Sequence, residues 1–257
     1  FHDYAGLGNA TYFTKNGLTV KDAMEKSFIE LDGKNELKSG SCNAGLEKNG
    51  NESSGKLTIK DDNDTKGSLT AKGGEGGGAG IGGGYESGAG NIEITGGTVE
   101  AVGGEGAAGI GGGVYGPGRD IEISGGKVSA SGGSYSSPEE DPRPGAAGIG
   151  DGAGRASDDT DDSNPGDLYI CGDAEVTAKA GSQMTDAKAP AIGGSYGEVP
   201  TENLSDDEHK VTGGRLTRLN ADGTVMEGMG YDYTSTPKPQ PDDDEDDDDD
   251  DLSLIHI

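Results

Sequence analysis

The chain has 257 residues, of which 51 are glycine and only 29% are hydrophobic, with no tryptophan and three phenylalanines. This apolar content is too low for an ordinary globular core, and the glycine and proline content approaches the range of low-complexity disorder. The net charge of −28 repels phosphates and anionic lipid, which excludes nucleic acid and membrane surfaces as partners. No apolar run reaches the roughly 18 residues of a membrane span, so we expect no membrane insertion.

The first part of the chain shows no repeat. The chain begins at Phe1 without Met or a signal peptide, and we expect a fragment of a larger protein in which residues 1–27 form an N-terminal partial segment. Val20–Phe28 is the best candidate for a helix, and its pattern is weak. Cys42 and Cys171 lie far apart without CxxC spacing, which favours two unpaired, packed thiols over one long-range disulfide.

A motif with one isoleucine among glycines recurs within residues 28–229, which we expect to form one repeat domain. Ile81 and Ile110 are 29 residues apart, as are Ile92 and Ile121. A fixed period of this kind indicates a repeat architecture rather than disorder. The copies are GAGIGGG at Gly78–Gly84, AAGIGGG at Ala107–Gly113, AAGIGDG at Ala146–Gly152 and a decayed APAIGGS at Ala189–Ser195.

Within one repeat the apolar residues alternate with polar ones. Ile92 and Ile94 share one face, then two glycines turn the chain, and Val99 and Ala101 share the next face. Short strands separated by glycine corners bury too little to stand alone, so successive copies must stack. The sequence therefore predicts an all-β, single-stranded parallel β-helix (β-solenoid) with glycine-rich corners and apolar ladders along its axis. The predicted ladders are Leu57/Ile92/Ile121/Leu168, Ile59/Ile94/Ile123/Ile170, Leu69/Val99/Val128/Val176, Ala71/Ala101/Ala130/Ala178 and Leu46/Ile81/Ile110/Ile149/Ile192.

Two insertions interrupt the third repeat, one between Gly133 and Gly145 and one between Gly152 and Asp167. Insertions in solenoids lie on one face, which is often the binding face. Tyrosines, of which two follow the glycine runs, are together with these loops the candidates for a ligand face, because an aromatic ring packs on the apolar face of a pyranose. Ordinary corner packing of each ring remains the alternative. The predicted ligand residues are Tyr85, Tyr115, Tyr135, Arg119 and Arg143.

Clustered carboxylates make Ca²⁺ the one cofactor that the sequence suggests. The candidate ligands stand in the second insertion, for which a solvated acidic loop is the alternative. No catalytic set is evident, since His2, His209 and His256 have no Ser/Asp or metal-ligand context. We therefore expect a protein that is not an enzyme. The candidate calcium ligands are Asp158, Asp159, Asp161, Asp162 and Asp167.

The C-terminal part changes character. Residues 230–251 contain a proline-rich linker and an acidic run, which we interpret as a solvated tail. The final LSLIHI at residues 252–257 resembles the translation of a sequencing-library adapter, so we interpret it as an artefact and leave it out of the fold prediction.

The succession of a Leu/Ile strand, GG, a Thr/Val strand, GG and GAGIGGG resembles glycine-rich repeat regions of large surface proteins from Gram-positive gut bacteria. Those regions are described as carbohydrate-binding, right-handed parallel β-helix domains. The resemblance implies a monomeric module of an extracellular, wall-associated protein that binds a polysaccharide or surface glycan or mediates adhesion. It supplies no catalytic residues. A purely structural stalk and a β-helix polysaccharide lyase or hydrolase are the alternatives.

Overall fold

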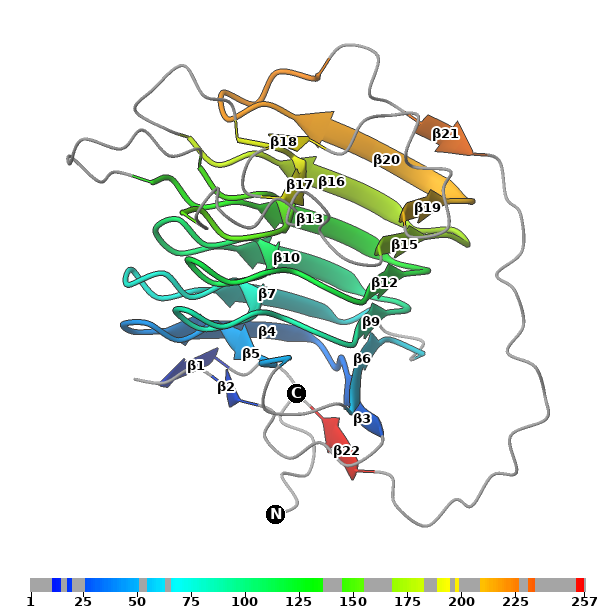
Figure 1. Ribbon diagram of the computed structural model, residues 1–257. Coiled ribbons are helices and arrows are strands. Elements are labelled where there is room, and N and C mark those ends of the chain that lie inside the picture. The colour runs from blue at the N-terminus through cyan, green and yellow to red at the C-terminus, as the bar shows by residue number, and fades with distance from the viewer. Residues whose placement is uncertain are drawn as a thin grey trace.

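The computed structural model describes residues 11–14, 18–19, 26–50, 55–62, 66–135, 145–154, 168–182, 189–194, 197–198, 209–226, 231–233 and 253–256. Every regular element in these residues is a β-strand. Figure 1 shows the strands stacked coil upon coil, from β4 near the N-terminal end to β20 at the other end. The described part of the chain contains no helix long and apolar enough to cross a membrane.

The strands form three sheets that run along the stacking axis, which we call sheets A, B and C. Sheet A contains, in spatial order, β1 (Thr11–Thr14), β4 (Lys34–Ser39), β7 (Ser68–Lys72), β10 (Thr98–Val102), β13 (Lys127–Ser131), β16 (Glu175–Lys179), β20 (Gly214–Leu219) and β21 (Tyr231–Tyr233). Sheet B contains β2 (Leu18–Thr19), β5 (Leu46–Glu47), β8 (Ile81–Gly82), β11 (Ile110–Gly111), β14 (Ile149–Gly150), β17 (Ile192–Gly194) and β18 (Gly197–Glu198). Sheet C contains β22 (Ser253–His256), β3 (Lys26–Glu30), β6 (Lys56–Lys60), β9 (Ile92–Ile94), β12 (Ile121–Ile123), β15 (Leu168–Ile170) and β19 (His209–Val211).

The pairing confirms the predicted parallel β-solenoid. Each coil contributes one strand to each sheet, and neighbouring coils pair in parallel; the antiparallel pairs are β17–β18 and β20–β21. Ile92 lies opposite Ile121, Val99 opposite Val128 and Ile81 opposite Ile110, as the 29-residue period predicts. All five predicted ladders are present, and their members are buried.

Polar residues replace apolar ones where two of these ladders reach the ends of the column. Asn35 on β4 lies opposite Leu69, and Arg218 on β20 lies opposite Ala178. Both side chains are fully buried. These two ladders thus end in buried polar side chains, and Nδ2 of Asn35 donates a hydrogen bond to the Asp32 carbonyl at 3.1 Å.

The glycine corners bring backbone against backbone. A Cβ added to Gly103 would lie 1.9 Å from the carbonyl oxygen of Ala107, so no side chain fits there. At Gly97 and Gly126 the φ angles are +81° and +78°, which only glycine adopts without strain. These corners therefore require glycine, because the backbones of neighbouring turns are in direct contact.

Four smaller predictions can be compared with the structure. Residues 26–28 of the weak helical candidate belong to β3 (Lys26–Glu30) instead, because this strand completes the coil beside β6. Cys42 and Cys171 do not form a disulfide; Cys171 is buried, but Cys42 is exposed rather than packed. β1 and β2, from the predicted N-terminal partial segment, pair with β4 and β5. Residues 253–256, within the segment interpreted as an artefact, pair with β3 at the edge of sheet C.

Candidate functional site

Two stacks of turns meet at one corner of the column: the turns that leave sheet A and the turns that leave sheet B. The Val114 N–H donates a hydrogen bond to the Gly77 carbonyl at 2.9 Å, and the Ala153 N–H donates to the Gly106 carbonyl at 2.7 Å. Each sheet B turn is thereby tied to the sheet A turn of the preceding coil. The result is a continuous edge along the stacking axis.

Three of the predicted ligand residues gather on this edge. The ring centroids of Tyr85 and Tyr115 are 5.8 Å apart, with an interplanar angle of 89°. The hydroxyl oxygens of Tyr115 and Tyr135 are 3.5 Å apart, and either can donate. Tyr85 is 41% exposed and is one of two exposed large hydrophobic side chains among the described residues. We call Tyr85, Tyr115 and Tyr135 the tyrosine row.

The tyrosine row packs against the backbone at two glycines, Gly77 and Gly106. A Cβ at Gly77 (φ +97°) would lie 2.7 Å from Cγ2 of Val114 and 3.2 Å from Cδ2 of Tyr85. A Cβ at Gly106 (φ +66°) would lie 2.7 Å from Cδ2 of Tyr135. The side chains that form the row therefore pack directly on two left-handed turns that admit no side chain of their own.

The three tyrosines do not occupy one repeated position. The 29-residue period aligns Tyr85 with Val114 and Glu86 with Tyr115, and Glu86 and Tyr115 share a positive φ of 57° and 64°. Tyr135 follows β13 and so comes from the sheet A turn. The row forms because the two stacks of turns fold together, which is also how Gly77, Gly106 and Val114 come to support it.

Tyr85 also has a definite protonation state. Partial desolvation raises the pKa of Tyr85, and the negative charge of Glu86 raises it further. The phenol therefore stays protonated at neutral pH and keeps its hydroxyl as a hydrogen-bond donor. The backbone N–H of Tyr85 donates to the Cys42 carbonyl at 2.7 Å, which fixes the start of its turn.

The remaining predicted residues are placed less completely. Arg119 is exposed in the turn that leads from β11 into β12. Arg143 lies outside the described residues, as do the candidate calcium ligands Asp158, Asp159, Asp161, Asp162 and Asp167. Among the residues that the structure does describe, no group of three or more His, Cys, Asp or Glu side chains is arranged to hold a metal ion.

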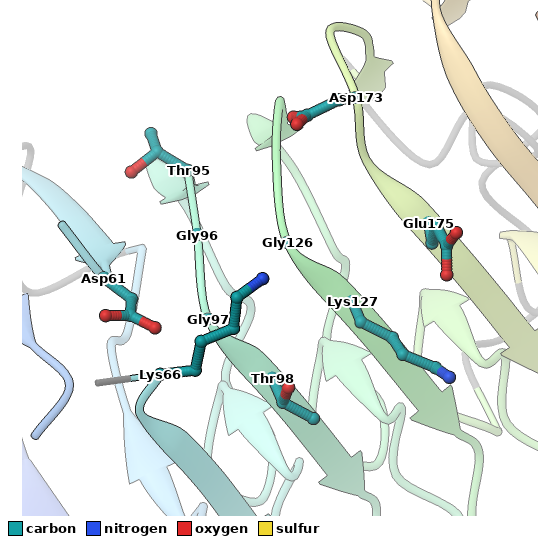
Figure 2. A pocket seen from close by; sticks show the side chains of 10 residues that line it. All are labelled: Asp61, Lys66, Thr95, Gly96, Gly97, Thr98, Gly126, Lys127, Asp173 and Glu175. Atoms are coloured by element: carbon teal, nitrogen blue, oxygen red, sulfur yellow. The ribbon is translucent and has the colours of Figure 1, made fainter. Parts of the chain in front are cut away.

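Nothing in the sequence pattern singles out a second feature, a polar cavity at another corner where the turns connect sheet C to sheet A (Figure 2). It draws on four successive coils, and the residues that line it differ from coil to coil. Sequence repeats therefore do not reveal such a site.

Comparison with known proteins supports the repeat. Neither the curated proteins nor the solved structures contain a match to this chain. A family described as Beta helix repeat matches residues 92–114 and 121–153. Both matched segments begin at the first residue of a sheet C strand and run through the sheet A and sheet B strands that follow. The two central coils are thus similar to the β-helix repeat family, in agreement with the parallel solenoid that the strand pairing shows.

Proposed function

We propose that this protein is a non-enzymatic, extracellular repeat protein that binds surface or dietary glycans, or mediates adhesion through them, and that the tyrosine row is its contact surface. The observation that carries the proposal is the convergence of three tyrosines from three separate turns on one edge of the solenoid. Isolated corner packing of each ring would not require that convergence.

The row suits an extended saccharide. Its rings follow one another along the stacking axis, so a glycan laid along the edge meets aromatic surface on successive coils. A ring packs against the C–H face of a pyranose, while the phenol hydroxyl hydrogen-bonds to the hydroxyl groups of the sugar. The negative charge of the chain favours neutral glycans over acidic ones.

The resemblance of the repeat to bacterial surface proteins supports an extracellular, wall-associated location and a monomeric module of a larger protein. A purely structural stalk is the second candidate. It is favoured by the continuous stack of coils, which would hold a neighbouring domain at a fixed distance.

Glycan-array binding and capture on insoluble polysaccharides test the proposal with the full chain. Tyr85→Ala removes the most exposed ring and should weaken capture about tenfold, which corresponds to about 1.4 kcal/mol. The double variant Tyr115→Phe/Tyr135→Phe keeps both rings and removes both hydroxyls, so it should weaken capture less. Tyr169→Ala, which removes a half-buried tyrosine on β15 outside the row, is the matched control and should leave capture unchanged.

Equal loss in the Tyr85 and Tyr169 variants would count against the row as the contact surface. Absence of capture on every polysaccharide, with and without Ca²⁺, would reject glycan binding and leave the stalk as the better proposal. Release of reducing ends or unsaturated uronides from the polysaccharides would instead show an enzyme.

A further inference from the structure

The second corner of interest connects sheet C to sheet A and holds a cavity of about 500 Å³. Asp61 and Lys66, from the β6–β7 turn, line one end, and Asp173 and Glu175, from the β15–β16 turn and the start of β16, line the other. Figure 2 shows the two coils between these ends, with Gly96, Gly97 and Gly126 at their turns and the side chains of Thr95, Thr98 and Lys127 beside them. We call this feature the corner groove.

The groove is hollow because two of the three residues in each middle turn are glycines. The central coils turn with Thr-Gly-Gly at 95–97 and Ser-Gly-Gly at 124–126, whereas the flanking turns carry charged residues. Gly97 and Gly126 have left-handed φ angles of +81° and +78°. A Cβ at Gly97 would lie 2.7 Å from Cδ1 of Leu31, so this position is closed to side chains by both strain and space.

The floor offers backbone hydrogen-bonding groups. The carbonyls of Gly97 and Gly126 accept hydrogen bonds from the N–H groups of Lys127 and Glu175, both at distances below 3 Å. The N–H groups of Gly96, Gly97 and Gly126 donate to no residue in the part of the chain that the structure describes. A ligand on the floor can therefore accept hydrogen bonds from peptide groups that the solenoid itself does not use.

The walls offer side chains of both signs. Within the described residues, the side chains of Lys66, Lys127, Asp173 and Glu175 take part in no hydrogen bond or ion pair. Asp61 is held in place by the Gly67 N–H, which donates to its Oδ2 at 2.8 Å. In Figure 2 the Lys66 side chain reaches across the Gly97 turn toward Gly126. Donors and acceptors are thus both present along the groove, and carboxylates outnumber ammonium groups.

This chemistry matches a chain of neutral sugars. Each hydroxyl group of a saccharide donates to a carboxylate and accepts from an ammonium or peptide N–H, so a mixed lining satisfies it fully. An anion would face three carboxylates on a chain of net charge −28. We propose that the corner groove is a second saccharide site, specific for a neutral oligosaccharide that lies along the stacking axis; the choice of sugars as the ligand class rests on the proposed function.

The dimensions set the length of the ligand. Four coils span three inter-strand spacings of about 4.8 Å, about 14 Å in all. A pyranose in an extended β-linked chain advances by a similar distance, so the groove accommodates a trisaccharide with one sugar per spacing.

Titration calorimetry of the full chain with cellotriose, xylotriose and mannotriose tests the site, with trigalacturonate as the acidic probe. At least one neutral trisaccharide should bind and trigalacturonate should not. Asp173→Asn/Glu175→Gln should weaken binding at least tenfold, and Thr98→Trp, which places a large ring at the exposed groove wall, should abolish it. Glu100→Gln is the control. Glu100 is an exposed residue on β10, two positions after Thr98, and its side chain lies outside the groove, so this variant should bind the trisaccharide as the wild type does.

Variants of the tyrosine row and variants of the corner groove have different expected effects, so the two proposals can be tested separately. Tyr85→Ala should leave trisaccharide binding unchanged, whereas the groove variants should leave polysaccharide capture by the tyrosine row unchanged. Trisaccharide binding that is lost in Tyr85→Ala but kept in the groove variants would overturn the groove and support the row. Capture of polysaccharide without any trisaccharide binding, or preference for trigalacturonate, would also overturn the groove. Absence of both activities would overturn both proposals.

Discussion

Individual positions in this solenoid are constrained in two separable ways. Some glycines adopt a left-handed backbone, some lie where a neighbouring carbonyl leaves no room for a Cβ, and some do both. Gly223 has a φ of +87° with nothing within 4 Å of an added Cβ. Gly103 has no such φ, yet an added Cβ would lie 1.9 Å from the Ala107 carbonyl oxygen. Substitutions at these two positions therefore separate the cost of backbone strain from the cost of steric overlap.

We predict that Gly223→Ala costs about 1–2 kcal/mol in the free energy of unfolding, the cost of a left-handed alanine. Gly103→Ala should cost about 3 kcal/mol or more, because the backbone of the following turn must move. Urea denaturation of both variants measures the difference. Equal costs would mean that the corners relax easily and that backbone packing does not stabilise them.

Two exceptions to the glycine rule show when a side chain is tolerated. Lys48 and Asp151 occupy the register position of Gly83 and Gly112, where an added Cβ would lie 2.0 and 1.9 Å from a carbonyl oxygen of the following turn. In the coil of Asp151 the connection that follows carries the insertion between Gly152 and Asp167. Its Oδ1 accepts a hydrogen bond from the Gly118 N–H of the preceding coil at 2.8 Å.

Lys48 is fully buried, and desolvation lowers its pKa from the ordinary value of 10.5. Between the lowered pKa and 10.5 the unfolded chain binds more protons than the folded one, so stability rises with pH through this window. We predict that Lys48→Met is more stable than the wild type at pH 7 and that the advantage shrinks toward pH 10. Urea denaturation at several pH values measures it.

Lys60 provides the control of opposite sign. Its Nζ lies 2.8 Å from Oδ2 of Asp62 and 3.1 Å from Oε2 of Glu30, and these partners raise its pKa above 10.5. Its contribution is fully present below pH 10.5 and is lost as the pH rises through the raised pKa. Lys60→Met should therefore be less stable than the wild type at pH 7. A pH profile of Lys48→Met that parallels the wild type would refute the assignment to Lys48.

Among the elements, sheet B depends least on side chains. Its strands in the central coils have two residues, one isoleucine and one glycine, and the turns on either side carry the tyrosine row. The row and the insertions adjoin: residue 136 follows Tyr135, and residue 155 follows the turn that is tied to Gly106. The regular elements position the site, and the connections between them supply its chemistry.

The connection between β14 and β15 contains the five aspartates that the sequence suggests as calcium ligands. We predict that millimolar CaCl₂ raises the melting temperature and that EDTA reverses the effect, because binding to the folded state alone is stabilising. Replacing Asp158, Asp159, Asp161 and Asp162 by Asn should remove the response. Deletion of the acidic run at residues 242–251 is the control and should leave the response intact. Persistence of the response in the Asn variant would place the calcium elsewhere.

For the complete column, the fold follows from two periods in the sequence. Alternation at period two fixes which residues face inward, and the 29-residue repeat fixes which of them meet, so the sequence alone is enough to place Ile94 opposite Ile123. The corner groove and the meeting of Tyr135 with Tyr115 could not be predicted in this way. Both depend on how non-equivalent turns fold against one another, and neither repeats. The burial of Arg218 could not be predicted for a related reason, since at the end of the column the repeat no longer constrains the residue.

The same two periods make a strict prediction about deletions. Removal of Glu100–Val128, which is 29 residues, joins Val99 to Ser129 and leaves every inward position inward. The shortened chain should fold, unfold cooperatively and keep its β circular dichroism spectrum. Removal of Glu100–Lys127, which is 28 residues, joins Val99 to Val128 within one strand, and a slip of one residue reverses the facing of the side chains beyond it.

The 28-residue deletion should therefore be less stable than the 29-residue deletion by about 2–5 kcal/mol, the cost of losing a buried apolar side chain. Both deletions remove Tyr115 and divide the tyrosine row, so polysaccharide capture should fall in the 29-residue variant although its fold is kept. Urea denaturation and capture assays on the same two proteins measure these effects. Equal stability of the two variants would mean that the turns absorb a change of register, and the ladders would then not be what aligns the coils.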